Sequence, residues 1–269
     1  MAMIRKAAVA GSFYPGARER LRAEVEALRS GGAAPREAVA AVIPHAGYMY
    51  SGRVAAAVYA QISRPATWVI LGPNHTGLGA SASIMTSGAW ETPLGAMSID
   101  TELAQAILAR SSKLRDDPLA HTREHSIEVQ LPFLQYKGGS SAFVPIALFA
   151  HDYAVCQDVG LAVAEAIRAT GRRTVLAAST DMSHYVSRSV AATQDRKAID
   201  AMLALDPEEL HRVVRREGIS MCGFHAATAV LVAAKTLGAA SAELVAYTDS
   251  GEVTGDMKEV VAYAGLVIR

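Results

Sequence analysis

Three short apolar runs, each closed by turn-forming or polar residues, constrain the fold of this chain more than any other feature. They occupy residues 38–43 (AVAAVI), 67–71 (TWVIL) and 174–178 (TVLAA). Runs of this length without polar alternation are typical of strands that are buried on both faces of a parallel sheet. Segments with helical periodicity lie between them, such as residues 17–29 and 153–169. This alternation predicts an α/β fold.

The chain is expected to form one domain, residues 1–269, with a mixed, mostly parallel sheet between helices on both faces. Its 269 residues suit one large α/β domain, and 51% apolar residues supply a sizeable core. The remaining pattern predicts a hairpin or a turn-rich excursion at 90–99. It also predicts strands at 81–86, 143–149, 243–247 and 259–268, and helices at 101–110, 124–134, 190–205, 207–216 and 226–237.

Charge and composition argue against several classes of partner. The 26 Lys and Arg residues balance the 26 Asp and Glu residues, so nothing indicates a nucleic-acid or anionic-membrane surface. No apolar segment approaches the length of a membrane span. Two cysteines, Cys156 and Cys222, are too few and too far apart for a disulfide framework. We therefore expect a soluble, cytoplasmic protein that binds a small molecule or a peptide.

Histidines follow the three apolar runs at the point where each predicted strand ends. His45 lies in PHAGYMYSG after the first run, and His75 ends LGPNH after the second. Asp181 and His184 lie in STDMSHY after the third. Because the carboxyl ends of parallel strands share one edge of a sheet, where such folds bind ligands, these rings are expected to converge. The histidines outside such settings are expected on the surface: His121, His151 and His211.

Two further segments add polar groups with less specific patterns. EHSIE places Glu124, His125 and Glu128 at a predicted helix start, where a solvated acidic first turn explains them equally well. SMCGFHA places Cys222 and His225 at the mouth of an alanine-rich helix. A helix N-terminus lowers a thiol's pKa, which favours a reactive or metal-binding thiolate. A lone cysteine is otherwise a small buried apolar residue.

Imidazoles together with one anionic ligand are a donor set for divalent transition metals. Two histidines and a carboxylate, with open coordination positions, describe non-haem Fe(II) oxygenases. A thiolate in place of the carboxylate favours softer ions, such as Zn or Cu, or Fe with altered redox behaviour. The donor set therefore predicts a divalent or redox metal and leaves Fe(II), Cu and Zn open.

Six separated motifs resemble those of the Memo family, whose bacterial and archaeal members are also called AmmeMemoRadiSam system protein B. The resemblance extends in order over nearly the whole chain. The motifs are AGSFYP (10–15), PHAGYMYSG (44–52), LGPNH (71–75), EHSIEVQLPF (124–133), STDMSHY (179–185) and MCGFHA (221–226).

The resemblance implies a fold related to the catalytic subunit of class III extradiol ring-cleavage dioxygenases, a mixed sheet between helical layers. It implies that His45 and His75 are metal ligands and that Cys222 is the third. It also implies that His184 is the acid/base histidine and that Asp181 belongs to the pocket. Because a cysteine stands where the dioxygenases have a glutamate, dioxygenase activity does not follow from the resemblance alone.

The resemblance also carries expectations about partners. Animal members are associated with receptor-tyrosine-kinase-driven motility, phosphotyrosine peptides and copper or iron. Receptor signalling is implausible for a chain this short and without eukaryotic appendages. The system name implies a genomic association with an AMMECR-type protein and a radical SAM protein, which are the candidate protein partners.

Three functions are consistent with these residues. The first is a metal-dependent, dioxygenase-like redox enzyme in which His184, oriented by Asp181, transfers a proton. Tyr48 and Tyr185 would line its pocket, together with His125 and His225. The second is a non-catalytic module that binds a metal, an anion or a phosphopeptide in a vestigial dioxygenase site.

The third function is a Cys–His hydrolase that needs no metal. Cys222 would be its nucleophile and His184 or His225 its base. Amides at the following helix start would form the oxyanion hole.

Overall fold

The centre of the molecule is a set of four parallel strands, three of which are the predicted apolar runs. The structure is a computed structural model that describes residues 3–29, 34–136, 142–149 and 152–269. Strand β9 lies between β2 and β3, and β8 lies beyond β3. These strands are β2 (Ala40–Ile43), β3 (Thr67–Pro73), β8 (Ala142–Leu148) and β9 (Thr174–Ser179).

Other strands extend this sheet on both sides, mostly in the antiparallel sense. The order is β10-β12-β2-β9-β3-β8-β4-β7, and β11 also pairs with β12. The two predicted final strands are present as β11 and β12. The added strands are β4 (Ala82–Ile84), β7 (Arg115–Asp116), β10 (His184–Val186), β11 (Ala242–Asp249) and β12 (Val260–Ile268).

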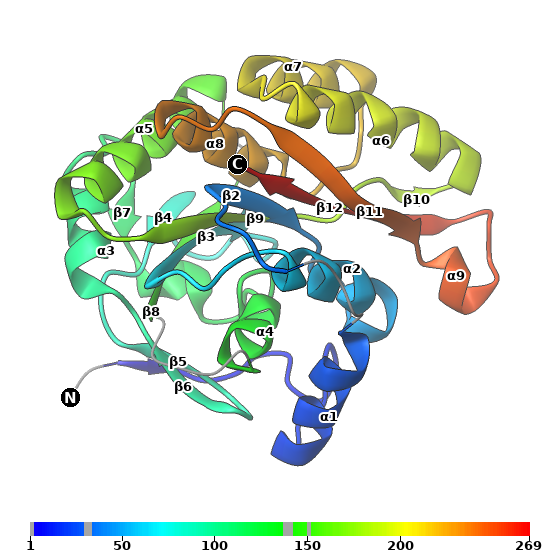
Figure 1. Cartoon of the computed structure of the whole chain (residues 1–269), viewed down its shortest axis with the longest axis horizontal. Coiled ribbons are helices and arrows are strands. Elements are labelled where there is room, and N and C mark those ends of the chain that lie inside the picture. The colour runs from blue at the N-terminus through cyan, green and yellow to red at the C-terminus, as the bar shows by residue number, and fades with distance from the viewer. Residues whose placement is uncertain (1–2, 30–33, 137–141, 150–151) are drawn as a thin grey trace.

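Helices pack on both faces of the sheet, as Figure 1 shows. The upper layer in that view contains α5 (Tyr153–Thr170), α6 (Arg188–Leu203), α7 (Pro207–Glu217) and α8 (Phe224–Thr236). The lower layer contains α1 (Arg18–Leu28), α2 (Tyr48–Ala60) and α4 (Leu131–Tyr136). Two further helices are α3 (Thr101–Leu108), beside α5, and α9 (Gly251–Thr254), between β11 and β12. The predicted α/β fold with a mixed, mostly parallel sheet is confirmed.

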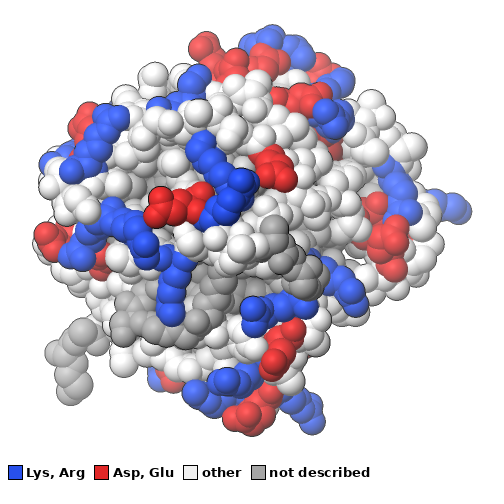
Figure 2. All heavy atoms as spheres, viewed as in Figure 1, with Lys and Arg blue, Asp and Glu red and all other residues white. Residues whose placement is uncertain are grey.

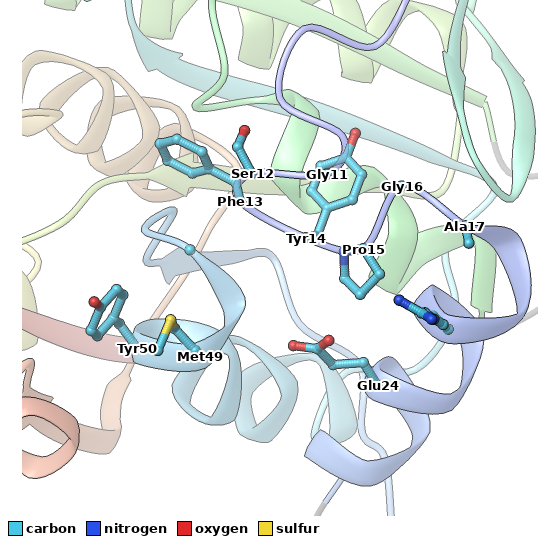
Figure 3. Close-up of a pocket in the computed structure, with 12 residues that line it drawn as sticks. Gly11, Ser12, Phe13, Tyr14, Pro15, Gly16, Ala17, Glu24, Met49 and Tyr50 are labelled. Carbon is cyan, nitrogen blue, oxygen red and sulfur yellow. The ribbon is translucent and has the colours of Figure 1, made fainter.

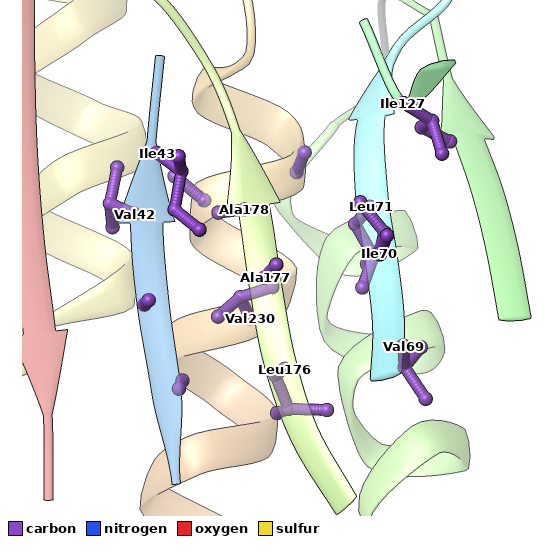
Figure 4. Close-up of a cluster of buried hydrophobic side chains, with 14 of the residues drawn as sticks. Val42, Ile43, Val69, Ile70, Leu71, Ile127, Leu176, Ala177, Ala178 and Val230 are labelled. Carbon is purple, nitrogen blue, oxygen red and sulfur yellow. The ribbon is translucent and has the colours of Figure 1, made fainter. Parts of the chain in front are cut away.

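The core lies where the parallel strands meet these helices. Figure 4 shows side chains of β2, β9 and β3 packed with Val230 of α8 and with Ile127. Val42, Ile70 and Leu176 are fully buried. Because both faces of these strands are covered, apolar residues occupy consecutive positions rather than alternate ones.

A second, three-stranded sheet joins the N-terminal segment to the predicted hairpin. The hairpin is present as β5 (Ala89–Thr92) and β6 (Gly95–Ser98), and β1 (Ile4–Arg5) pairs with β5 in parallel. Strand β1 has only two residues, so no periodicity could predict it.

The segment 124–134 is not the single helix that its periodicity predicts. A 3₁₀ turn, η2 (Glu128–Gln130), leads into α4, and Pro132 lies in the first turn of α4 rather than at its end. The Glu124 carboxylate accepts the backbone N–H groups of His125 and Ser126. This local capture of N–H groups competes with helix formation. Proline is tolerated in a first turn because its missing N–H would be unpaired there.

Glu128 holds the N-terminal segment against the body of the protein. Its carboxylate, fully buried, forms an ion pair with Arg5 and accepts hydrogen bonds from the Tyr14 hydroxyl and from the backbone N–H groups of Ala8 and Val9. Of the two explanations left open for Glu124 and Glu128, the solvated acidic turn is therefore wrong. Both carboxylates are buried because each meets several donors, and buried charges require such partners.

Two histidines expected on the surface are buried. His121 forms a hydrogen bond with Ser83 through Nε2, and His211 packs against Tyr153 and Phe224. Lone histidines enter a core when a partner satisfies one nitrogen, which the sequence pattern does not reveal. The third, His151, lies outside the described residues.

Charges of both signs are interspersed on the face shown in Figure 2, in keeping with the balanced composition. Within the described part of the chain, no helix combines the length and the apolar character needed to cross a membrane.

The Arg5–Glu128 pair yields a stability prediction. Arg5→Met leaves a buried carboxylate without its counter-charge, so we expect the free energy of unfolding to fall by about 3–5 kcal/mol in urea titrations. Lys6→Met is the control, because the neighbouring Lys6–Glu91 pair is exposed and should contribute at most about 1 kcal/mol. Equal losses in the two variants would contradict the role given to Glu128.

Candidate metal centre

The carboxyl ends of β2 and β3, with β9 between them, bring two of the three predicted histidines together. Ile43 pairs with Ser179, and Leu71 pairs with Ala178, so the three strands end at nearly the same level. His45 and His75 each follow within two residues of their strand's end. Their ring centroids are 5.3 Å apart. The predicted convergence of these two imidazoles is present in the structure.

His125 completes a cluster of three imidazoles. Its ring stacks on His75 at 4.7 Å and meets His45 edge-on at 5.5 Å. One ring nitrogen from each residue lies within 4.8 Å of the others, so the cluster could hold a metal ion. The sequence placed His125 in the pocket but did not include it among the metal ligands, because no apolar strand precedes it.

His45 is the buried member of the cluster. Its backbone N–H donates to the Asp181 carboxylate, 2.7 Å, and its Nδ1 lies 3.0 Å from the Ser179 hydroxyl. Burial lowers the pKa of His45 well below its usual value, and the neighbouring rings of His125 and His75 lower it further. The ring is therefore neutral at physiological pH, and the neutral imidazole is the form that binds metals.

Glu124 holds the other two rings. Its carboxylate accepts the His75 backbone N–H and lies 3.0 Å from His75 Nδ1 and 3.4 Å from His125 Nδ1. Burial by itself raises the pKa of this carboxyl, but hydrogen bonds and charge interactions with His75 and His125 outweigh it and lower the pKa to about 2. A carboxylate on Nδ1 orients a histidine so that Nε2 is free to bind a metal.

The sulfur of Cys222 lies in the same crevice. Its Sγ is 3.3 Å from His45 Nε2 and accepts the Asp181 backbone N–H at 3.3 Å. Zn–N and Zn–S bonds sum to about 4.3 Å, so one ion can contact both atoms. Burial and the Asp181 carboxylate raise the thiol pKa, contrary to the lowering predicted from the helix start. The reason is that desolvation and the nearby Asp181 carboxylate outweigh the hydrogen bonds that favour the thiolate.

His184 and Asp181 are both present but are not arranged as predicted. His184 Nδ1 faces the carbonyl oxygens of Met182 and Ser220, at 2.7 and 2.9 Å, and these oxygens orient its ring. The Asp181 carboxylate instead holds the His45 backbone. Burial raises the pKa of Asp181 to about 6, which its hydrogen bond from His45 only partly offsets. In place of the expected pairing of His184 with Asp181, backbone carbonyl oxygens orient His184 and the Asp181 carboxylate binds the His45 backbone.

The remaining predicted pocket residues lie around the crevice in different ways. Tyr48 is buried, and its hydroxyl donates to the Val129 carbonyl, so that hydroxyl is not directed to a ligand. Tyr185 is 74% exposed and has a left-handed backbone, φ 57°. His225, on α8, packs against Phe224 of the same helix and against His211 of α7.

A groove of about 510 Å³ adjoins the cluster (Figure 3). Residues 11–17 line one side, and Gly47, Met49 and Tyr50 line the other. The Phe13 ring, which lines the groove, also packs against His125 at 4.6 Å. The AGSFYP motif thus forms a wall shared by the groove and the imidazole cluster.

The fold and the site define an α/β protein with a three-histidine cluster, able to hold a metal ion, at the carboxyl edge of its parallel strands. A family model described as Memo-like protein matches residues 5–267. The chain therefore belongs to the Memo-like protein family, as its motifs predicted.

Curated archaeal relatives support the same assignment over full length. A MEMO1 family protein of Methanopyrus kandleri is 44% identical and covers 99% of each chain. Another, from Methanothermobacter thermautotrophicus, is 42% identical over 98% of this chain and 100% of its own. A third, from Methanosarcina acetivorans, is 43% identical over 99% of each.

The pKa of Glu124 predicts how stability depends on pH. Its folded pKa of about 2 lies below its ordinary value of 4.5, so its contribution is complete above pH 4.5 and is lost as pH falls through 2. The shift corresponds to about 3 kcal/mol. We expect wild type to exceed Glu124→Gln by about this amount in urea unfolding at pH 7, and the difference to vanish near pH 2.

The matched control for this titration is Glu26→Gln, which removes an exposed carboxylate of α1. Its unfolding free energy should follow that of wild type at every pH. A Glu124→Gln variant with an unchanged pH dependence would contradict the role of Glu124 as the carboxylate that holds His75 and His125.

Proposed function

We propose that this chain is a metal-dependent, dioxygenase-like redox protein whose ion is bound by His45, His75 and Cys222, with His125 beside them. The observation that carries the proposal is the convergence of three imidazole nitrogens within 4.8 Å and of a thiol sulfur 3.3 Å from His45 Nε2. Fe(II) and Cu suit this donor set, and Zn also fits it.

The ion would supply coordination positions for oxygen or a substrate oxygen atom, which is the chemistry that the protein's own groups lack. The chain's residues hold the site in its binding form. His45 and His125 have lowered pKa values and are neutral, so no proton has to leave them before they bind. Cys222 must release its proton, and the Asp181 N–H that donates to its sulfur stabilises the thiolate.

His184 is the proposed proton-transfer residue. In its neutral form the Nδ1–H donates to the carbonyl oxygens of Met182 and Ser220, which leaves Nε2 to accept a proton. This fixed tautomer is what a general base requires. Neighbouring Tyr185 keeps a strained backbone at this point, and such strain is concentrated at functional sites.

A second candidate function is ligand binding without turnover, which the adjoining groove favours. The groove has aromatic walls at Phe13 and Tyr50 (Figure 3), and Arg20 and Glu24 also line it, so it suits a small molecule or a peptide. An AMMECR-type or a radical SAM protein remains a candidate partner by family association. The hydrolase is disfavoured because burial raises the pKa of the Cys222 thiol and leaves it protonated.

Metal loading tests the proposal. After anaerobic reconstitution with Fe(II), or loading with Cu(II), we expect wild type to retain about one ion per chain, measured by elemental analysis after desalting. His45→Ala and His75→Ala should retain almost none, because each removes an imidazole of the centre. Cys222→Ser should lose the sulfur-to-metal charge-transfer band, and the control Cys156→Ser, in the buried part of α5, should keep it.

Two results would contradict the proposal. One is wild-type protein without metal above background, and the other is a Cys222→Ser variant with an unchanged spectrum. Oxygen uptake by the loaded protein in the presence of catechols separates the redox function from ligand binding alone.

A further inference from the structure

Behind His45 lies a chain of buried polar groups that the proposed function does not by itself explain. Gln130, Ser179 and Tyr59 are each at most 2% exposed. They connect in order, from Tyr59 to Gln130, from Gln130 to Ser179 and from Ser179 to His45 Nδ1. Buried polar groups are kept only where each donor and acceptor has a partner, so the direction of each bond can be deduced.

The amide of Gln130 can be oriented in one way only. Its Nε2 lies 3.0 Å from the Pro44 carbonyl oxygen, which can only accept. The nitrogen must therefore face Pro44, and Oε1 accepts from the Tyr59 hydroxyl at 2.9 Å. The second N–H of the amide then donates to Ser179 Oγ at 2.8 Å.

The hydroxyl of Ser179 is consequently directed away from His45. Its single hydrogen donates to the Ser126 carbonyl oxygen, 2.6 Å away, because two oxygens this close need a proton between them. One lone pair of Oγ receives the Gln130 N–H. The other faces His45 Nδ1 at 3.0 Å, so that nitrogen must be the donor.

We propose that Ser179, with its hydroxyl directed by Gln130, is a positioning residue that fixes His45 as the Nδ1–H tautomer. The lone pair of Nε2 then points at Cys222 Sγ, 3.3 Å away. The inference rests on the proposed function only in that metal binding is the use of this tautomer. The tautomer itself is a property of the metal-free protein and can be measured there. Glu124 fixes the ring of His75 in the same way, by facing its Nδ1. Ser179 and Glu124 therefore direct the Nε2 atoms of His45 and His75 into one crevice.

The test compares two buried serines. Ser179→Ala removes the acceptor of the His45 Nδ1–H, and Ser126→Ala removes an equally buried hydroxyl that donates to the Pro73 carbonyl but leaves the Ser126 carbonyl in place. The probe is long-range ¹H–¹⁵N correlation spectroscopy of the imidazole nitrogens in metal-free protein, which distinguishes Nδ1–H from Nε2–H. Gln130→Met, of similar size, tests the amide.

We expect His45 to be the Nδ1–H tautomer in wild type and in Ser126→Ala. In Ser179→Ala the Nε2–H tautomer should become populated, and Gln130→Met should give a smaller change in the same direction. Titration with Zn²⁺ alone should show affinity lowered by about 10–100-fold in Ser179→Ala and little changed in Ser126→Ala.

An Nε2–H ring in wild type, or the same tautomer in Ser179→Ala as in wild type, would overturn the inference. So would equal losses of Zn²⁺ affinity in the two serine variants, because that pattern indicates a merely structural effect. If wild type binds none of Zn²⁺, Fe(II) or Cu(II), the proposed function fails, and the spectra of metal-free protein still decide the role of Ser179.

Discussion

The parallel register of β2, β9 and β3 is the constraint on which the rest of the site depends. Hydrogen bonding across these strands sets Ile43 beside Ser179 and Leu71 beside Ala178, so three chain segments leave the sheet at one level. The sheet can sustain this only because helices cover both faces, which is why its strands are apolar at successive positions. His75 and Asp181, which follow His45 by about 30 and 135 positions in the sequence, thereby reach the same crevice as His45.

Three imidazoles are each oriented through Nδ1 by a different acceptor, and this support determines what the crevice can do. Ser179 stands behind His45, Glu124 behind His75, and the carbonyl oxygens of Met182 and Ser220 behind His184. Buried polar networks of this kind specify one arrangement when they are fully satisfied. The arrangement presents ring nitrogens and a thiol that keeps its proton until a cation displaces it. Such a donor set suits a metal better than it suits an unassisted nucleophile.

The sequence was sufficient to predict where His45 and His75 meet, but not which residues orient their rings. Apolar runs just before His45 and His75 were sufficient to predict the sheet edge and the convergence of these rings, because consecutive apolar residues indicate a strand that is buried on both faces of a parallel sheet. The burial of Glu124 and Glu128 was not predictable, since an acidic turn looks the same whether its partners are water or Arg5 and His75. The tautomer of His45 depends on Gln130 and Ser179, which are distant in sequence and ordinary in type. The pKa of Cys222 was mispredicted because the local helix start is visible in the sequence and the surrounding desolvation is not.

The proposed site requires imidazole nitrogens and the Cys222 sulfur to bind one ion, and X-ray absorption spectroscopy of Zn²⁺-loaded protein can establish this. The spectrum should contain nitrogen scatterers at about 2.0–2.1 Å and one sulfur scatterer at about 2.3 Å from the ion. A first shell made only of oxygen atoms, as around a solvated ion on the surface, would contradict it.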